Sequence, residues 1–466
     1  MAEPAVTIAE VPADRDASPR LAASLQPRHV AMISLGGVVG AGLFVGSSTA
    51  IQNAGPAAML AYLLAGAISF LMMRMLGEMA VARPGHGSFN SYIRLSLGPA
   101  ASFVSGWLYW YFWLIVVGAE TIAGASLIHD WTPVAPVWAI GLVLITLMTL
   151  TNLMSVRSYG EFEFWFSLLK VGAIALFVAG GAAWMAAASP HPALSNLTAH
   201  GGFAPHGLLA VLATVLVVVF SLTGSEIASI AAAESDDPAR NVARASRTVA
   251  LRILMFYIAA IFVIVCIVPW TDIRSGHSPF VAAMDVMGVP GGRAVMRLIV
   301  LVAVLSCLNS GLYVTSRILR ELAAQGDAPA ALVRTGARQV PIRAILTGSV
   351  AGFGASVASI ISPDLVFAFL LNTSGAVILV IYAMIAAAQV RARRAMQARH
   401  ETPAFAMWWF PWLSYIAIAA MASVLVAMAI LPAQRAQVTA SLLSVAVVMV
   451  ACRLRRARTA SHARRA

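Results

Sequence analysis

The sequence predicts an all-α polytopic membrane protein with twelve transmembrane helices. Of its 466 residues, 60% are hydrophobic and only 11% are charged, whereas a soluble domain carries about 25% charged residues. Twelve apolar runs are long enough to cross a bilayer as helices. Their approximate limits are 30–52, 57–81, 101–128, 135–154, 163–186, 207–232, 248–269, 294–316, 343–361, 364–390, 408–430 and 436–452.

The arginines lie between these runs and predict how the chain is oriented. With the N-terminus in the cytoplasm, 26 arginines fall on the inner side of the membrane, and four fall outside: Arg274, Arg293, Arg297 and Arg435. Inner loops of membrane proteins carry such an excess of basic residues. Both termini are therefore expected in the cytoplasm, and the net charge of +12 needs no nucleic-acid partner.

The first apolar run contains Gly36, Gly37, Gly40 and Gly42 within seven residues. Glycine weakens a helix, and unpaired backbone groups in lipid cost several kcal/mol unless they line a polar cavity. We therefore expect a break here, with the amides of Gly40, Ala41 and Gly42 facing a carboxylate. A helix-packing seam of the Gly-x-x-x-Gly type, formed by Gly36 and Gly40, is the alternative.

Two ionisable side chains lie inside the third and fifth runs. Lys170 is the single lysine of the chain, and a buried ammonium is costly unless it is paired or neutralised. Alternatively, its long side chain reaches cytoplasmic water, because Glu163 lies only about two helical turns away. Glu120, in the outer part of the third run, is a candidate for proton coupling or for a hydrogen bond to another span.

The sixth run contains a second predicted break, at 220–226. Ser221, Thr223 and Gly224 favour local backbone interactions over a continuous helix, and the ionisable Glu226 follows directly. Breaks in runs one and six predict two five-helix halves related by a pseudo-twofold axis in the membrane plane. The expected organisation is a disordered cytoplasmic tail (1–28), a first repeat (29–206), an inverted second repeat (207–392), helices eleven and twelve (393–452) and a basic cytoplasmic tail (453–466).

Several ordered stretches resemble the bacterial amino acid permeases of the amino acid, polyamine and organocation superfamily. They are residues 28–44, 77–80, 87–89, 159–165, 224–226 and 233–238. Within that family, the chain looks most similar to the 4-aminobutyrate (GABA) permeases. That finer resemblance is carried by residues 106–113, 127–131 and 306–313.

The resemblance implies a position for each end of a zwitterionic amino acid. The carboxylate would lie against Gly40, Ala41 and Gly42. The amino group would be held by backbone carbonyls of two segments, Ser34 to Gly37, which includes Gly36, and Phe220 to Thr223, which includes Ser221. Phe220 matches an aromatic residue that covers the substrate, although by spacing alone it would be one more core aromatic.

The resemblance also implies proton coupling. Lys170 matches a family lysine that occupies the place where related sodium symporters bind a cation, so that a tethered ammonium would replace sodium. Asn309 and Ser310, with Ser306, would then face Lys170, although small polar residues between membrane helices more often serve packing and hydrogen bonding. Glu226 is a proton-linked or break-stabilising candidate. No metal or organic cofactor is expected, and the proton gradient is the driving force.

The sequence thus predicts a proton-coupled importer of GABA or a related ω-amino acid, working by alternating access in the bacterial inner membrane. The alternatives are a permease for an aromatic amino acid, proline or β-alanine, and an amino acid exchanger. A membrane enzyme is disfavoured because the sequence has no metal-spaced His/Glu cluster and no histidine deep in an apolar run. A channel is disfavoured because nothing resembles a filter loop.

Overall fold

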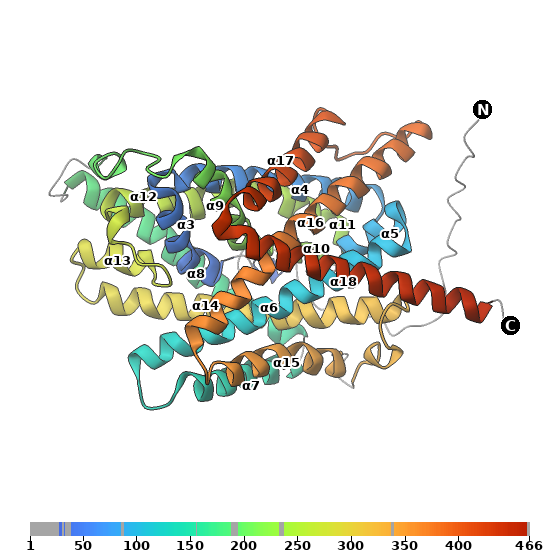
Figure 1. The fold of residues 1–466 in the computed structure, drawn as a ribbon, viewed down its shortest axis with the longest axis horizontal. Coiled ribbons are helices and arrows are strands. Elements are labelled where there is room, and N and C mark those ends of the chain that lie inside the picture. The colour runs from blue at the N-terminus through green and yellow to red at the C-terminus, as the bar shows by residue number, and fades with distance from the viewer. Residues whose placement is uncertain are drawn as a thin grey trace.

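The computed structural model describes residues 28–29, 32, 39–84, 88–154, 156–187, 194–232, 237–336 and 340–463. All regular structure within these residues is helical, and the long helices run side by side through the molecule (Figure 1). The α-helices are α2 (Ala41–Phe44), α3 (Gly46–Ala54), α4 (Ala58–Ala82), α5 (Phe89–Leu97), α6 (Pro99–Trp131), α7 (Val137–Met154), α8 (Val156–Ala187), α9 (Gly207–Leu222), α10 (Ile227–Ala232), α11 (Pro238–Arg252), α12 (Ala259–Ile267), α13 (Pro279–Val286), α14 (Gly292–Ala324), α15 (Ile342–Ala358), α16 (Pro363–Ala398), α17 (Trp412–Ile430) and α18 (Pro432–Ala463). Short 3-10 turns and one π-helical segment, η3 (Ile253–Ile258), connect or extend them.

Nine helical stretches in the described part of the chain are long and apolar enough to cross a membrane. Two shorter apolar helices, Met255–Ile267 and Ile342–Ala358, accompany them. Leucine, valine and other large apolar side chains project from the outer surfaces of these helices, where they suit contact with lipid rather than water. The helices therefore form a polytopic membrane protein.

At both predicted breaks the described backbone departs from helical geometry, and residues 33–38, directly before the first break, lie outside the described residues. In the first apolar run, Gly40 is extended (φ −134°, ψ −153°), and the short α2 follows it. In the sixth run, α9 ends at Leu222, Thr223 is extended (φ −67°, ψ 140°), and α10 resumes the helix. Gly224 has a φ of 120°, a value that side chains rarely tolerate. The backbone of the second break therefore requires a glycine at position 224.

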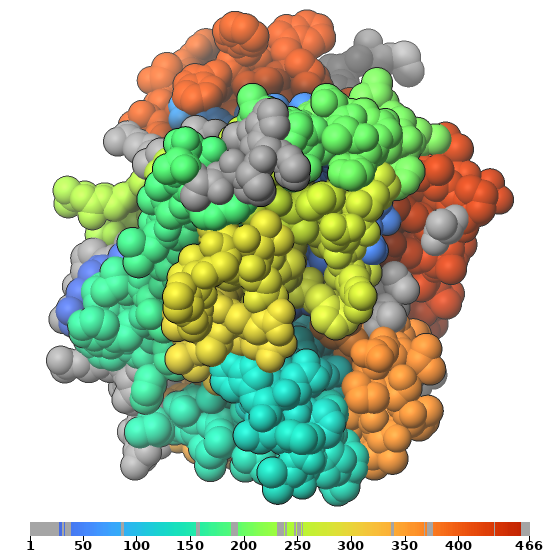
Figure 2. Space-filling model, turned by 90° about the vertical axis from the view of Figure 1, so that its left-hand side faces the viewer, coloured from blue at the N-terminus to red at the C-terminus, as the bar shows by residue number. Residues whose placement is uncertain are grey.

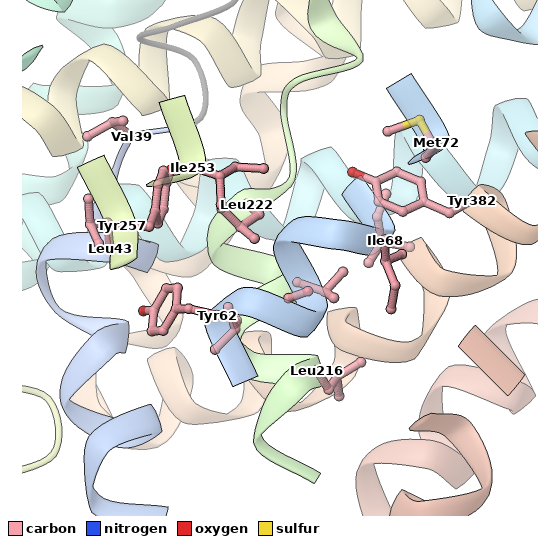
Figure 3. Packing of buried hydrophobic residues seen from close by; sticks show 14 of the residues in the cluster. Val39, Leu43, Tyr62, Ile68, Met72, Leu216, Leu222, Ile253, Tyr257 and Tyr382 are labelled. Carbon is pink, nitrogen blue, oxygen red and sulfur yellow. The ribbon is translucent and has the colours of Figure 1, made fainter. Parts of the chain in front are cut away.

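The helix α6 lies at the centre of the bundle. It packs against α14, α15 and α16, and it also contacts α5, α7 and α18 (Figure 1). A large buried apolar cluster joins α4, α9, η3 and α16 beside the two breaks (Figure 3). Within this cluster, the rings of Tyr62 and Tyr257 lie 6.1 Å apart. Close packing on several sides lets the chain hold its irregular segments in defined positions.

Candidate substrate site

A cavity of about 490 Å³ lies where the two breaks meet. Its walls include Ala41 and Gly42 from α2, Glu120 from α6, and Phe220 and Ser221 from α9. All five were predicted from the sequence as site residues. The volume lies within the range of about 300–1,000 Å³ that is usual for small-molecule sites. The cavity is therefore large enough for a small amino acid.

The two breaks touch directly through Gly42 and Ser221. The hydroxyl of Ser221 donates a hydrogen bond to the carbonyl oxygen of Gly42 at 2.7 Å. A Cβ atom on Gly42 would lie 2.8 Å from the Cα of Ser221, which is closer than van der Waals contact allows. The hydroxyl of Tyr257 donates to the carbonyl oxygen of Ser221 at 3.2 Å. The glycine therefore permits the close approach of α2 and α9.

At the first break, a backbone amide donates a hydrogen bond to one of the protein's own carboxylates. The amide of Ala41 donates to Oε1 of Glu120 at 3.2 Å, and Glu120 is buried. Its other oxygen, Oε2, has no hydrogen-bond partner among the residues that the structure describes. Cys307 closes the same corner, because a Cβ on Gly40 would lie 2.6 Å from the Cβ of Cys307. An amide in this break is thus positioned to bind a carboxylate.

Lys170 reaches the first break from α8. Its ammonium donates to the carbonyl oxygen of Val39 at 3.0 Å and to the hydroxyl of Ser306 at 2.8 Å. The side chain is fully buried, so the alternative of a lysine extended into cytoplasmic water is wrong. Burying an ammonium is favourable only when hydrogen bonds and opposite charge replace its hydration.

The opposite charge near Lys170 comes from Glu163, which the sequence analysis did not choose as a site residue. Its Oε1 lies 3.8 Å from the ammonium and accepts a hydrogen bond from the hydroxyl of Ser306 at 2.5 Å. The hydroxyl of Ser167 also donates to Oε1, at 3.3 Å. Because residues seven apart lie on one face of a helix, the spacing of Glu163 and Lys170 contained this signal.

Ser310 and Asn309 lie one turn from Ser306 on α14, and the hydroxyl of Ser310 is also a hydrogen-bond partner of the Glu163 carboxyl group. The hydroxyl of Ser310 lies 3.2 Å from that of Tyr159. The side-chain oxygen of Asn309 accepts a hydrogen bond from Asn152 at 2.7 Å, which ties α14 to α7. The structure thus brings Ser306 to the ammonium of Lys170 and Ser310 to its carboxyl partner Glu163, whereas Asn309 binds Asn152 of α7.

Glu226 is held at the second break by three donors from separate parts of the fold. Tyr109 of α6 donates to Oε1 at 2.9 Å. Tyr382 of α16 and the amide of Gly224 donate to Oε2 at 3.0 and 3.1 Å. The carboxyl group is fully buried. Sequence reasoning missed both tyrosines, because their contacts with Glu226 join positions far apart in the chain.

Of the remaining predicted residues, Phe220 and Thr223 lie at the second break, and three others fall outside the described part of the chain. Phe220 is half-buried in the cavity wall, and its ring meets that of Phe112 edge to face at 5.8 Å. The hydroxyl of Thr223, directly after α9, donates back to the carbonyl oxygen of Val219 in that helix at 2.8 Å. Ser34, Gly36 and Gly37 lie outside the described residues.

Comparison with known proteins identifies the family. The family model described as "Amino acid permease" matches residues 29–457. A protein named "Probable GABA permease" from Pseudomonas aeruginosa is 46% identical, with 94% of this chain and 93% of the relative covered. A "Gamma-aminobutyric acid permease" from Bacillus subtilis is 43% identical (94% and 94% covered). One from Escherichia coli is 41% identical (92% and 93% covered). Since the match runs through nearly the whole chain, this protein belongs to the amino acid permease family.

Proposed function

We propose that this permease imports 4-aminobutyrate, or a closely related ω-amino acid, by proton-coupled alternating access across the bacterial inner membrane. The substrate follows from the names of the three relatives, which align over more than nine-tenths of the chain. The coupling is carried by one observation, the fully buried ammonium of Lys170 at the carbonyl oxygen of Val39.

In this proposal, Lys170 takes the place of a bound metal cation. Backbone carbonyls at a helix break attract cations, and the single lysine of the chain supplies one that is covalently attached and can release its proton. Ser306 connects the ammonium to Glu163 by two hydrogen bonds. A proton moving from Lys170 to Glu163 through this hydroxyl would neutralise both groups, which changes the electrostatic field at the first break.

The substrate carboxylate would replace Glu120 at the amide of Ala41. That exchange is favoured when Glu120 is protonated, because a neutral carboxyl group is a weaker acceptor than the substrate's carboxylate. Phe220, in the wall of the same cavity, would cover the bound substrate. Gly40 and Gly42 keep the backbone of the first break accessible, while Ser221, Thr223 and Gly224 shape the second break.

The proposed transport cycle also includes the arrangement of the spans. Twelve crossings would consist of two inverted five-helix halves, 29–206 and 207–392, followed by two further helices, with both termini in the cytoplasm. The arginine distribution supports this orientation. Movement of one half against the other about the two breaks would expose the cavity to each side in turn.

Purified protein in liposomes tests both the substrate and the coupling ion. Uptake of labelled GABA is compared with that of β-alanine, proline and phenylalanine, under an inward proton gradient or an inward sodium gradient applied separately. We expect GABA to accumulate against its gradient with protons and not with sodium. Accumulation of phenylalanine alone would overturn the substrate, and accumulation driven by sodium alone would overturn the coupling.

A further inference from the structure

A second cavity, of about 780 Å³, lies where α6, α13, α14 and α16 converge. Figure 2 looks onto this end of the molecule, where α13 and the start of α14 (yellow) lie beside the end of α6 (cyan) and the segment leading into α16 (orange). Four aspartates and three arginines line the cavity. This mixture of charges differs from the strongly basic connections at the predicted cytoplasmic end.

We call this second cavity the outer cavity and the substrate cavity the inner one. The two cavities share helices along their walls. On α6, Glu120 lines the inner cavity and Ile122 lines the outer one. Near the first break, Gly46 lines the inner cavity and Val45 the outer one. Phe367 of α16 lines both. The two cavities are therefore neighbours, and the side chain of Phe367 lies between them.

Arg297 is a half-buried cation of the outer cavity that remains available for a ligand, whereas Arg274, which also has no side-chain partner among the described residues, is exposed. One turn earlier on α14, Arg293 is bound to Asp285 by two hydrogen bonds, one of them 2.7 Å from Nε. Arg297 is half-buried and makes no side-chain hydrogen bond or ion pair with the described residues. The buried hydroxyl of Ser278, in the same cavity, also has no partner among them. A guanidinium in this position suits a carboxylate, which it can bind with two parallel hydrogen bonds.

A carboxylate suited to the amino end of a zwitterion lies close to Phe367. Asp364 is one turn before Phe367 on α16, so the two side chains share a face of the helix. Asp364 makes no ion pair within the described part of the chain. An ammonium group held there would lie next to the boundary with the inner cavity.

We propose that the outer cavity is a second binding site, which captures the zwitterionic amino acid before it enters the substrate cavity. Arg297 binds the carboxylate, Asp364 binds the ammonium group, and the substrate then passes Phe367. This inference rests on the proposed function, because it takes the same ligand. A charged cavity raises the local concentration of a ligand with complementary charges, and salt weakens the effect.

The test is initial-rate uptake of labelled GABA into proteoliposomes by the wild type, Arg297→Gln, Arg297→Lys and Arg435→Gln. Arg435 is a matched control, because it is also predicted to lie outside and its guanidinium instead binds carbonyls at the end of α17. We expect kcat/KM to fall about fivefold or more in Arg297→Gln, with kcat within about twofold of the wild type. The kcat/KM of Arg297→Lys should lie between those of the wild type and Arg297→Gln, and the kcat/KM of Arg435→Gln should equal that of the wild type.

Ionic strength separates capture from a structural role. Added salt should lower kcat/KM of the wild type and leave that of Arg297→Gln nearly unchanged. If Arg297→Gln inserts poorly, Asp364→Asn should show the same loss of kcat/KM at normal kcat. An unchanged KM in Arg297→Gln, or equal salt dependence in both proteins, would overturn the outer site. Absence of GABA uptake by the wild type would instead overturn the proposed function, and the variants would then be compared on the amino acid that it does transport.

Discussion

The ammonium of Lys170 donates to the carbonyl oxygen of Val39, the residue directly before the extended Gly40. This hydrogen bond joins α8 to the first break, and Ser306 joins the same ammonium to α14. A single charged group of α8 therefore links that helix to α14 and to an irregular segment. Any change in its protonation alters the contacts of all three.

Replacing Lys170 by alanine should abolish proton-driven accumulation, because both hydrogen bonds and the exchangeable proton are lost. Lys170→Arg should preserve the charge yet also fail to accumulate substrate, because a guanidinium does not release its proton. Uptake in proteoliposomes with and without a pH gradient checks both variants. Normal uphill uptake by Lys170→Ala would contradict the coupling mechanism.

Replacing Gly42 by leucine should block substrate binding while the protein still inserts in the membrane. The added side chain would collide with the backbone of Ser221 and project into the cavity that Gly42 lines. The control is Gly172→Leu on α8, since a Cβ at Gly172 meets no atom within 4 Å. Equilibrium binding of labelled GABA to purified protein measures the effect. Full-strength binding by the Gly42 variant would remove this glycine from the site.

Replacing Tyr382 by phenylalanine should lower the thermal stability of the purified protein. The change removes one of the two donors to Oε2 of the buried Glu226, and an intramolecular hydrogen bond contributes about 0.5–1.5 kcal/mol. Tyr109→Phe should cost more, about 1–3 kcal/mol, because it leaves the buried Oε1 of Glu226 without its described donor. The double variant should lose more than either single variant. Tyr415→Phe is the control, because its hydroxyl contact with Arg394 is exposed. Thermal unfolding in detergent, followed by tryptophan fluorescence, measures the effect. Equal stability of the wild type and the variants would show that the two tyrosine hydrogen bonds to Glu226 are unimportant.

Replacing Arg455 by alanine should loosen the end of α18 from the rest of the bundle. Its guanidinium binds the buried carboxylate of Asp327, which also accepts a hydrogen bond from Arg94 at 3.0 Å. A second contact reaches the carbonyl oxygen of Gly326 at 2.7 Å. We expect faster trypsin cleavage after the arginines of α18 in this variant. Arg456→Ala, an exposed neighbour, should leave the cleavage rate at Arg453 unchanged.

The sequence predicted the helical fold and both breaks because these features depend on local composition. Glycines at 40 and 42, and the Ser, Thr and Gly residues at 221–224, weaken a helix wherever the chain folds. The long apolar runs likewise predict helices without knowledge of their neighbours. The π-helical η3 was not predicted, because its residues read as an uninterrupted helix.

The partners within the candidate site could not be predicted in the same way. Glu120 and Ala41 were chosen for separate reasons, and their hydrogen bond follows from the packing of α6 beside the first break. Tyr109 and Tyr382 reach Glu226 from helices whose relative positions no local pattern specifies. Side chains that bridge distant elements become recognisable only when the tertiary packing is known.

The contact between Gly42 and Ser221 limits how the substrate specificity of this permease can change by mutation. A larger residue on either side of that contact would separate α2 from α9, so a wider binding chamber cannot arise there by simple substitution. Ala213 and Leu216 line the same chamber farther from this contact, toward the start of α9. Substitutions that adapt the chamber to larger substrates are therefore expected at those two positions before Gly42 or Ser221.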